Sequence, residues 1–229
     1  MNIAIIPARG GSKRIPKKNI KKFYGLPVIA YSIKMALSIG CFNEVMVSTD
    51  DDEIKAIAIK YGAKVPFKRS KKNSNDFSTT SDVLKEVIES YELKNQYFDY
   101  ACCIYPTAPL IREQDIIEGY NKLIEQSLHS VIPVVPFSFP VQRALKFEKE
   151  KLKFVNNKYA TTRSQDLEKR YHDAGQWYWL KIDEFKKNNV LYSENTGYIE
   201  LNEAQVQDID NKIDWKLAEL KYELLQSLK

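Results

Sequence analysis

The sequence predicts an α/β protein with a mainly parallel, twisted sheet and helices on both faces. Short apolar runs of strand length alternate with longer segments of helical periodicity, the pattern of parallel strands joined by crossover helices. The chain has 229 residues, of which 44% are hydrophobic, so it can build a sizeable core and is not disordered. We therefore expect a single domain over residues 1–229, with an inserted lobe at about residues 137–173.

The elements predicted in the first half each carry a local signal. The strands are short apolar runs bounded by polar residues. The first helix has apolar residues at helical spacing, such as Ile29, Ile33 and Ala36, and Asp50 or Asp51 can cap the second helix. In chain order we expect strands at residues 3–6, 44–48, 64–67 and 100–105, and helices at residues 28–39, 52–61, 80–93 and 113–126.

The second half is less regular. Pro133 lies inside a predicted strand at residues 130–135, and because proline lacks an N–H it indicates an edge strand or a bulge. Residues 137–173 show no clean period, and a structureless loop of that length is improbable in a compact domain, so we expect a lobe there. The remaining predicted elements are short strands at residues 145–147 and 151–155 in the lobe, strands at residues 176–180 and 197–200, and a final helix at residues 215–228.

Composition excludes several classes of protein. No apolar run approaches the ~18 residues of a membrane span, and the first residues lack the layout of a signal peptide. We expect a cytoplasmic protein with no membrane partner. Cys41, Cys102 and Cys103 have no metal-ligand spacing, so a packing role is favoured. Neither His129 nor His172 accompanies a serine or cysteine elbow, so no catalytic triad is indicated.

The most informative segment follows the first strand. Gly10, Gly11 and Ser12 form a turn whose exposed backbone N–H groups can cradle an anion. Seven cations surround this turn, at Arg9, Lys13, Arg14, Lys17, Lys18, Lys21 and Lys22. Neither a Walker P-loop nor a dinucleotide-binding fingerprint is present. The segment favours a triphosphate site over the alternative of a solvated basic loop.

The positive charge is confined to this region. Residues 1–43 hold eight Lys or Arg and no Asp or Glu, whereas the remainder holds 27 Lys or Arg against 30 Asp or Glu. A local field steers a small anion into a cleft. A nucleic-acid groove instead needs an extended basic stripe with aromatic platforms, which the sequence lacks, so we expect no nucleic-acid partner.

Other polar segments follow predicted strands, where ligands of open α/β sheets bind. Two prolines make a rigid ledge at residues 106–109, although by itself this pattern is equally an ordinary turn. Residues 69–81 can hydrogen-bond a nucleobase edge, yet alone they are better explained as a flexible polar loop. Residues 171–179 combine a histidine, a carboxylate, an amide and aromatics, which suits a sugar-binding wall or an ordinary core strand.

Asp208 and Asp210 stand two residues apart near the C-terminus. In an extended segment they point to the same face, where two carboxylates repel unless a cation lies between them. Mg²⁺ suits such a pair, because it takes one or two carboxylates plus phosphate oxygens. The alternative is a solvated acidic turn before the last helix.

Together these motifs resemble the cytidylyltransferases that activate keto-sugar acids, a family that includes the CMP-sialic acid synthetases. The opening motif A-R-x-G-S-K-x-[IL]-x-x-K-N is matched by residues 8–19, V-S-T-D by residues 47–50, P-T-[SA]-P-L by residues 106–110 and D-x-D by residues 208–210. Sialic acid synthetases usually carry Gln where Tyr105 stands, and an R-x-N-G stretch where this chain reads Y-H-D-A-G-Q-W-Y. That departure resembles the pseudaminic acid cytidylyltransferase branch.

The resemblance implies a Rossmann-like nucleotidyltransferase fold and transfer of CMP from CTP to the anomeric hydroxyl of a nine-carbon keto-sugar acid, pseudaminic acid in the first place. It implies that Arg9, Lys13 and Lys18 are catalytic, that Asp208 and Asp210 hold Mg²⁺, and that residues 137–173 form the dimerisation arm of a homodimer. The implied nucleotide-binding residues are Ala8, Gly10, Gly11, Ser12, Asn19, Arg69, Ser78 and Thr80, and the implied sugar-binding residues are Tyr105, His172, Gln176 and Tyr178.

Three alternatives stay open at this point. Sialic or legionaminic acid is an alternative substrate for the same reaction. A regulatory module that binds nucleotide without turnover is an alternative from another class, although binding alone does not need two metal carboxylates. A basic nucleic-acid binder is the third, and a far higher affinity for CTP than for oligonucleotides would exclude it.

Overall fold

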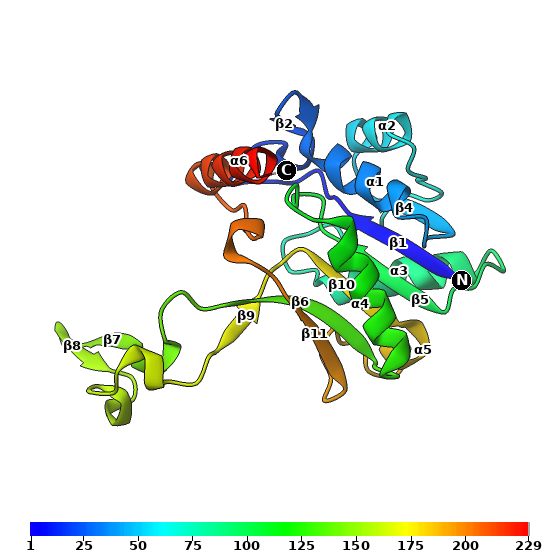
Figure 1. The fold of residues 1–229 in the computed structure, drawn as a ribbon. Helices are drawn as coiled ribbons and strands as arrows, with labels where there is room; N and C mark the ends of the chain where they lie inside the picture. Colours follow the sequence, from blue (N-terminus) through cyan, green and yellow to red (C-terminus); the bar gives the residue numbers. More distant parts are fainter. Residues whose placement is uncertain (229) are drawn as a thin grey trace.

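The computed structural model describes residues 1–228 and contains a seven-stranded mixed sheet (Figure 1). Six strands lie in the order β11-β6-β10-β5-β1-β4, and β9 pairs with β6. The strands are β1 (Asn2–Pro7), β4 (Glu44–Ser48), β5 (Tyr100–Ile104), β6 (Ser130–Pro136), β9 (Tyr171–Asp173), β10 (Trp177–Lys181) and β11 (Thr196–Glu200). Strand β1 is parallel to β4 and β5, and β11 is parallel to β6, whereas β9 and β10 run antiparallel to their neighbours. The predicted α/β class with a mainly parallel sheet is confirmed.

Helices cover both faces of the sheet, as predicted. Successive residues of a strand point to opposite faces, and β1 shows this clearly: Ala4 and Ile6 pack with the helix residue Ile33 in one buried cluster. Ile3 and Ile5 pack with Leu84 in the other. The helices of the first face are α1 (Val28–Ser38), α2 (Asp52–Lys60) and α4 (Glu113–Glu125), and those of the second are α3 (Thr80–Glu92) and α5 (Ile182–Asn188).

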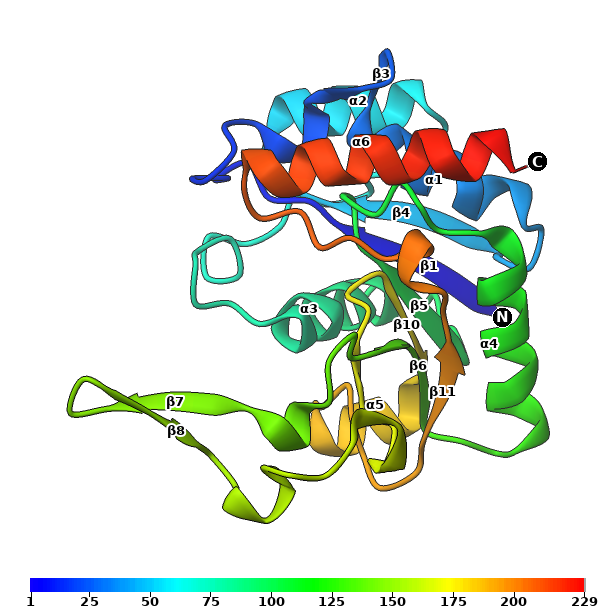
Figure 2. The ribbon, with the colours of Figure 1, turned by 60° about the vertical axis from the view of Figure 1, so that its left-hand side comes forward.

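The C-terminal helix α6 (Lys212–Ser227) packs beside the segment that follows β1 (Figure 2). Its Trp215 joins Ile15, Phe23 and Ile209 in a third buried cluster. Phe23 belongs to a small hairpin of β2 (Lys22–Phe23) and β3 (Leu26–Pro27). This packing fixes the segment before α6 against the cationic loop after β1.

Two of the predicted elements differ from the structure. The predicted strand at residues 64–67 is wrong, because only Lys64 bridges to Met46 and Pro66 then follows without an N–H to continue a ladder. The last helix begins three residues earlier than predicted, because Asn211 caps it in a capping box with Asp214.

The interior position of β6 corrects the edge-strand prediction that rested on Pro133. The carbonyl of Pro133 accepts a hydrogen bond from the backbone N–H of Ala174 at 3.0 Å. In a strand the N–H and C=O of one residue face the same side, so the missing N–H of Pro133 faces the place where the partner of β6 changes from β10 to β9. The ladder is interrupted there in any case, which is why a central strand tolerates this proline.

Helix α5 and several one-turn helices were not predicted, because each is too short to show a clear period. Helix α5 has only seven residues and buries Ile182 and Phe185. The one-turn 3-10 helices are Lys18–Ile20, Val141–Arg143, Asn157–Tyr159, Ser164–Asp166 and Glu203–Gln205.

The predicted lobe projects from the body of the protein in both ribbon views (Figures 1 and 2). Its tip is an antiparallel hairpin of β7 (Leu145–Glu148) and β8 (Lys151–Phe154), close to the two short strands predicted there. The predicted lobe extends too far at its end, because residues 171–173 pair with β6 in the main sheet as β9, so we call residues 137–170 the arm. The arm leaves the sheet at the end of β6 and returns at the start of β9.

Gly119 in α4 allows this helix to pack closely against Trp177 on the first face of the sheet. A Cβ at Gly119 would lie 2.6 Å from Cη2 and 2.8 Å from Cζ3 of the fully buried Trp177. We expect Gly119→Ala to lower the free energy of unfolding by about 1–2 kcal/mol, because overpacking outweighs the gain in helix propensity. Chemical denaturation measures this, with Asn121→Ala on the exposed face of α4 as the control. A Gly119→Ala protein as stable as the wild type would contradict the packing argument.

Candidate active site

The carboxyl ends of β1 and β5 open into a cleft of about 640 Å³, beside the end of β4. Because these strands are parallel, their carboxyl ends meet at one edge of the sheet, where α/β proteins bind ligands. The predicted site residues in its lining are Arg9, Ser12, Lys13, Lys18, Asn19, Arg69, Ser78, Thr80, Tyr105, Asp208 and Asp210. Segments up to two hundred residues apart in sequence therefore meet in one site.

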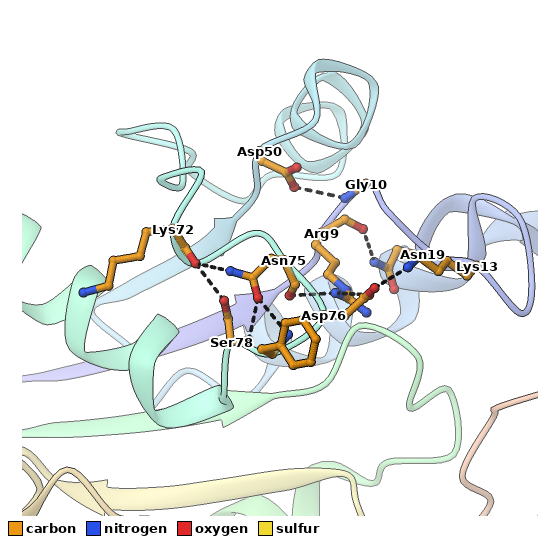
Figure 3. A network of polar contacts seen from close by, with 10 residues as sticks. Arg9, Gly10, Lys13, Asn19, Asp50, Lys72, Asn75, Asp76 and Ser78 are labelled. Carbon is orange, nitrogen blue, oxygen red and sulfur yellow. Dashed lines mark hydrogen bonds and ion pairs between the residues drawn. The ribbon is translucent and has the colours of Figure 1, made fainter.

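Two cations of the loop after β1 share one carboxylate (Figure 3). Arg9 lies 2.8 Å from Asp76, and Lys13 also pairs with Asp76. The guanidinium of Arg9 donates a further hydrogen bond of 2.7 Å to the carbonyl of Asn75. The hydrogen bond from Lys13 holds the pKa of Asp76 below its usual value. These contacts draw the polar loop at residues 70–79 across the cationic loop.

Asp76 and Asn75 were not predicted as site residues. The sequence singled out residues 69–81 as a polar segment but gave no sign of its partner. The cations nearest to Asp76 in the sequence, Lys71 and Lys72, stand five and four positions before it, so no local pattern indicated which cation it would pair with. The pairing depends on contacts across more than sixty residues of sequence.

The glycines shape the cationic loop rather than line the cleft. The N–H of Gly10 donates a 3.0 Å hydrogen bond to Asp50. A Cβ on Gly10 would lie 2.7 Å from the carboxylate of Asp51, which is fixed because it accepts from two N–H groups at the start of α2. Ala8, Gly10 and Gly11 are absent from the cleft lining, and Ala8 is fully buried where it extends the pairing of β1 with β4.

Asn19 ties the two ends of this loop together. Its side-chain amide donates a 2.9 Å hydrogen bond to the carbonyl of Arg9, and the side chain is buried at the floor of the cleft. The amide therefore holds the backbone of Arg9 while its own residue reaches the cleft.

Arg69 is a buried cation in the cleft wall. It is 6% exposed and donates from Nε to the hydroxyl of Ser48 at 3.0 Å, and from Nη2 to the Ser48 carbonyl. Within residues 1–228 no carboxylate lies within ion-pair distance of it. Burial lowers the pKa of Arg69 to about 10. A buried guanidinium with spare donors favours an anionic or carbonyl-bearing ligand.

Ser78 and Thr80 stand at the start of α3. The hydroxyl of Ser78 donates to the carbonyl of Lys72 at 2.9 Å, so its O–H is used within its own loop and its acceptor lone pairs remain. The hydroxyl of Thr80 lies 2.9 Å from the phenol oxygen of Tyr105. Both side chains line the cleft, and Thr80 also links the cleft to the strand end at Tyr105.

Asp208 and Asp210 lie together in the cleft lining, as their spacing predicted. Lys18 donates a 2.6 Å hydrogen bond from Nζ to the carbonyl of Ile209, and the same nitrogen is 3.9 Å from the carboxylate of Asp210. Arg14 pairs with Asp210 at 2.8 Å. Burial, and then the neighbouring Asp210, raise the pKa of Asp208. Burial lowers the pKa of Lys18.

A second cavity of about 640 Å³ adjoins the first and shares Tyr105 and Asp208 with it. His172, Asp173 and Tyr178 line this cavity. The hydroxyls of Tyr178 and Tyr192 donate to the carboxylate of Asp173 at 2.7 and 2.6 Å. Asp173 was predicted only as part of its segment and Tyr192 not at all, since their pairing joins residues nineteen positions apart.

Gln176 does not line either cavity. Its side chain is 3% exposed and donates to the carbonyl of Gln205, and Gln205 in turn donates to the buried Asp115 at 3.3 Å. Gln176 therefore supports the segment that leads to Asp208. Its position behind the cavity lining does not indicate direct contact with a sugar.

The described residues hold neither a preassembled metal cluster nor a membrane-spanning helix. Residues 1–228 contain no cluster of three or more His, Cys, Asp or Glu placed to hold a metal ion. A metal at Asp208 and Asp210 would therefore draw its further ligands from a substrate or water. No helix in the described part of the chain has the length and apolarity needed to cross a membrane.

Comparisons with known proteins identify the family. The cytidylyltransferase family model matches residues 3–195. The pseudaminic acid cytidylyltransferase of Campylobacter jejuni subsp. jejuni serotype O:2 is 40% identical over 97% of each chain. The CMP-N,N'-diacetyllegionaminic acid synthase of Legionella pneumophila subsp. pneumophila is 34% identical over 98% of this chain and 97% of the relative. The solved structure of CMP:2-keto-3-deoxy-manno-octonic acid synthetase complexed with CTP shares the fold, with a TM-score of 0.70, 18% identity and 99% of both chains covered.

The site and these matches agree with the predicted family. The chain belongs to the cytidylyltransferase family, whose members are CTP-dependent nucleotidyltransferases.

The two adjacent glycines of the loop should respond differently to substitution. We expect Gly10→Ala to raise the KM for CTP by about 10- to 100-fold, because the new methyl group collides with Asp51 and displaces the loop. Gly11→Ala is the matched control, since nothing lies within 4 Å of its added Cβ. Steady-state kinetics over a range of CTP concentrations measures both. Equal effects of the two substitutions on the KM for CTP would show that the contact with Asp51 does not determine the conformation of the loop.

Proposed function

We propose that this enzyme transfers CMP from CTP to the anomeric hydroxyl of a nonulosonic acid, with pseudaminic acid as the preferred substrate. The observation that carries the proposal is the pair of adjoining cavities that share Tyr105 and Asp208. One cavity is walled by cations and the other by tyrosines, a histidine and carboxylates. A nucleotide and a sugar acid can thus meet at the shared wall. We also propose that the reaction takes place in the cytoplasm, where CTP is made.

The reaction forms one bond and breaks one bond at the α-phosphorus of CTP. The anomeric oxygen attacks the phosphorus, pyrophosphate leaves with the electrons of the broken P–O bond, and the hydroxyl proton is lost to solvent or a nearby base. Arg9 and Lys13 are placed to hold the phosphates and to stabilise the charge on the departing pyrophosphate. Lys18 supports this role from the floor of the cleft.

A divalent cation, which we propose to be Mg²⁺, fits the chemistry of Asp208 and Asp210. Asp208 lies in the cleft lining beside a second carboxylate, and no cation of residues 1–228 lies within ion-pair distance of it. Such a group favours a bound cation. When bound between these carboxylates and the phosphates, the ion would neutralise charge and polarise the phosphoryl group. Arg14, which is largely exposed, is free to release Asp210.

The nucleoside is assigned to the wall formed by Arg69 and the loop before α3. Arg69 presents a buried cation with spare donors toward the cleft. Ser78, Thr80 and Asn19 supply hydroxyl and amide groups for ribose and cytosine. Ser12 lines the cleft beside the phosphate-binding cations.

The sugar is assigned to the second cavity. Tyr105, His172 and Tyr178 line it, and Tyr178 is held by the carboxylate of Asp173. Gln176 supports this wall from behind. The relatives named above act, by their names, on pseudaminic and legionaminic acid, and the higher identity to the pseudaminic acid enzyme favours that sugar. Sialic and legionaminic acid stand as the alternative substrates.

We also propose a homodimer formed through the arm. Phe139 and Phe147 are 83% and 85% exposed, and Leu152 and Val155 are also exposed. An isolated two-stranded hairpin is marginally stable in water, and exposed apolar patches mark interaction sites. A second copy of the chain that covers these side chains would stabilise the arm and place it near the partner's second cavity.

The sugar assignment is tested with pyrophosphate release from CTP and three acids: pseudaminic, legionaminic and sialic. We expect kcat/KM for pseudaminic acid to exceed that for sialic acid by at least about a hundredfold, because polar groups left unpaired in the wrong complex each lower affinity. Comparable values would overturn the sugar assignment and leave the cytidylyltransferase activity standing. Nucleotide binding with no pyrophosphate release from any acid would favour the regulatory module.

Metal dependence follows from the Asp208–Asp210 pair. We expect excess EDTA to abolish turnover, added Mg²⁺ to restore it, and Asp210→Asn to be close to inactive, because neither carboxylate alone balances the triphosphate charge. Asp183→Asn, on the exposed side of α5, is the control carboxylate. Undiminished turnover in EDTA would remove the metal from the mechanism.

The dimer is tested by light scattering. We expect a mass of twice the 26.6 kDa chain at micromolar concentration. Replacing Phe139 and Phe147 together by Asp should give a monomer with reduced turnover, because burial of a charge opposes association. Tyr97→Asp, at an aromatic residue outside the arm that is 62% exposed, is the control. A wild-type mass near 26.6 kDa would refute the dimer.

A further inference from the structure

Lys221 reaches the second cavity from the C-terminal helix α6. The side chains of that cavity include the carboxylates of Asp173, Glu203 and Asp208, which repel an acidic substrate. Apart from the titratable His172, Lys221 is the cationic residue in the described lining. No motif of the sequence pointed to it, because it stands among other lysines of an amphipathic helix.

The ammonium group of Lys221 is only partly satisfied by the protein. It donates to the carbonyl of Val206 at 2.6 Å and to the carbonyl of Glu203 at 3.0 Å. A lysine ammonium has three donors, so one N–H remains. No carboxylate in residues 1–228 lies within ion-pair distance of this nitrogen. Partial burial lowers the pKa of Lys221, which shows that its charge is desolvated without full compensation.

We propose that Lys221 binds the carboxylate of the keto-sugar acid and thereby sets the orientation of the sugar. The proposal rests on the function proposed above and adds a specificity residue to it. The ammonium group of Lys221 is partly desolvated and has one N–H left to donate. A substrate carboxylate can accept a charge-assisted hydrogen bond from it in a cavity that must bind an acid.

Substrate chemistry supports the position of Lys221. In a 2-keto-sugar acid the carboxyl carbon is bonded directly to the anomeric carbon that carries the attacking hydroxyl. The group that binds the carboxylate must therefore stand beside the reaction centre. Lys221 holds Val206, two residues before Asp208, and Asp208 lines both cavities. His172 and Tyr178 are then left for the other substituents of the sugar.

A bracing role must be separated from carboxylate binding, because Lys221 also holds two carbonyls of the segment before Asp208. The experiment compares the sugar acid with its C1 carboxamide, which keeps the shape of the substrate and removes its charge. The variants are Lys221→Met, which removes the ammonium, and Lys221→Arg, which keeps the charge. Lys216→Met, on an exposed part of the same helix, is the matched control.

We expect wild-type enzyme to prefer the acid over the carboxamide by about 10- to 100-fold in kcat/KM, since charge-assisted hydrogen bonds are the strong ones. Lys221→Met should lose that preference through a higher KM for the acid, with CTP affinity and the activating Mg²⁺ concentration unchanged. Lys221→Arg should retain part of the preference, and Lys216→Met all of it.

Each contrary result has a distinct meaning. If Lys221→Met lowers kcat/KM equally for the acid and the carboxamide, Lys221 only braces the segment before Asp208 and carboxylate binding is overturned. The same conclusion follows if the variant needs a different Mg²⁺ concentration but still prefers the acid. Unaltered discrimination would overturn it outright. If Lys221→Met fails to fold, as judged by circular dichroism, Lys221→Gln replaces it as the variant without charge. Discrimination lost in Lys221→Gln but normal in Lys216→Met supports the proposal, and full discrimination in Lys221→Gln refutes it. Wild-type enzyme that uses no keto-sugar acid would refute the proposed function itself.

Discussion

The repulsion among the cations after β1 is the constraint on which the rest of the site depends. Charges so close together destabilise the loop unless carboxylates lie among them. In the free protein these carboxylates come from distant segments: Asp76 pairs with Arg9 and Lys13, and Asp210 pairs with Arg14. Exposed ion pairs of this kind contribute only about 0–1 kcal/mol each. The triphosphate that we propose for this cleft can therefore replace them at little cost and meet cations that are already gathered.

The features that the sequence predicted are those encoded by residues close together in the chain, and the cationic loop is one of them. The apolar residues of β1, the capping Asp51 and the Gly-Gly turn are local signals, and the structure contains the corresponding strand, helix and loop. The cationic cluster and the spaced carboxylates are local signals too, so both walls of the cleft were foreseen. The resemblance in four ordered motifs then supplied the family, which the comparisons confirm.

The features that were missed depend on contacts far apart in the sequence. Asp76 becomes a residue of the site only through its ion pair with Arg9. The side chain of Gln176 is held by its hydrogen bond to the carbonyl of Gln205. The missing N–H of Pro133 indicated an edge strand or a bulge, whereas the change of partner strand at that point depends on β9 and β10. In each case the residue type indicated a special role, but the contacting residue that determines this role lies far away in the sequence and could not be identified from it.

Helix α6 completes the site although it supplies none of its phosphate-binding groups. Trp215 packs against Phe23 and so holds the helix on the first hairpin. Asp214 accepts from the backbone N–H of Asp210 at 2.9 Å, and Lys221 holds the carbonyls of Val206 and Glu203. The acidic segment is thus fixed at both ends by one helix. Because the segment has no ladder of its own around Asp208, this support is what keeps the two carboxylates opposite the cationic loop.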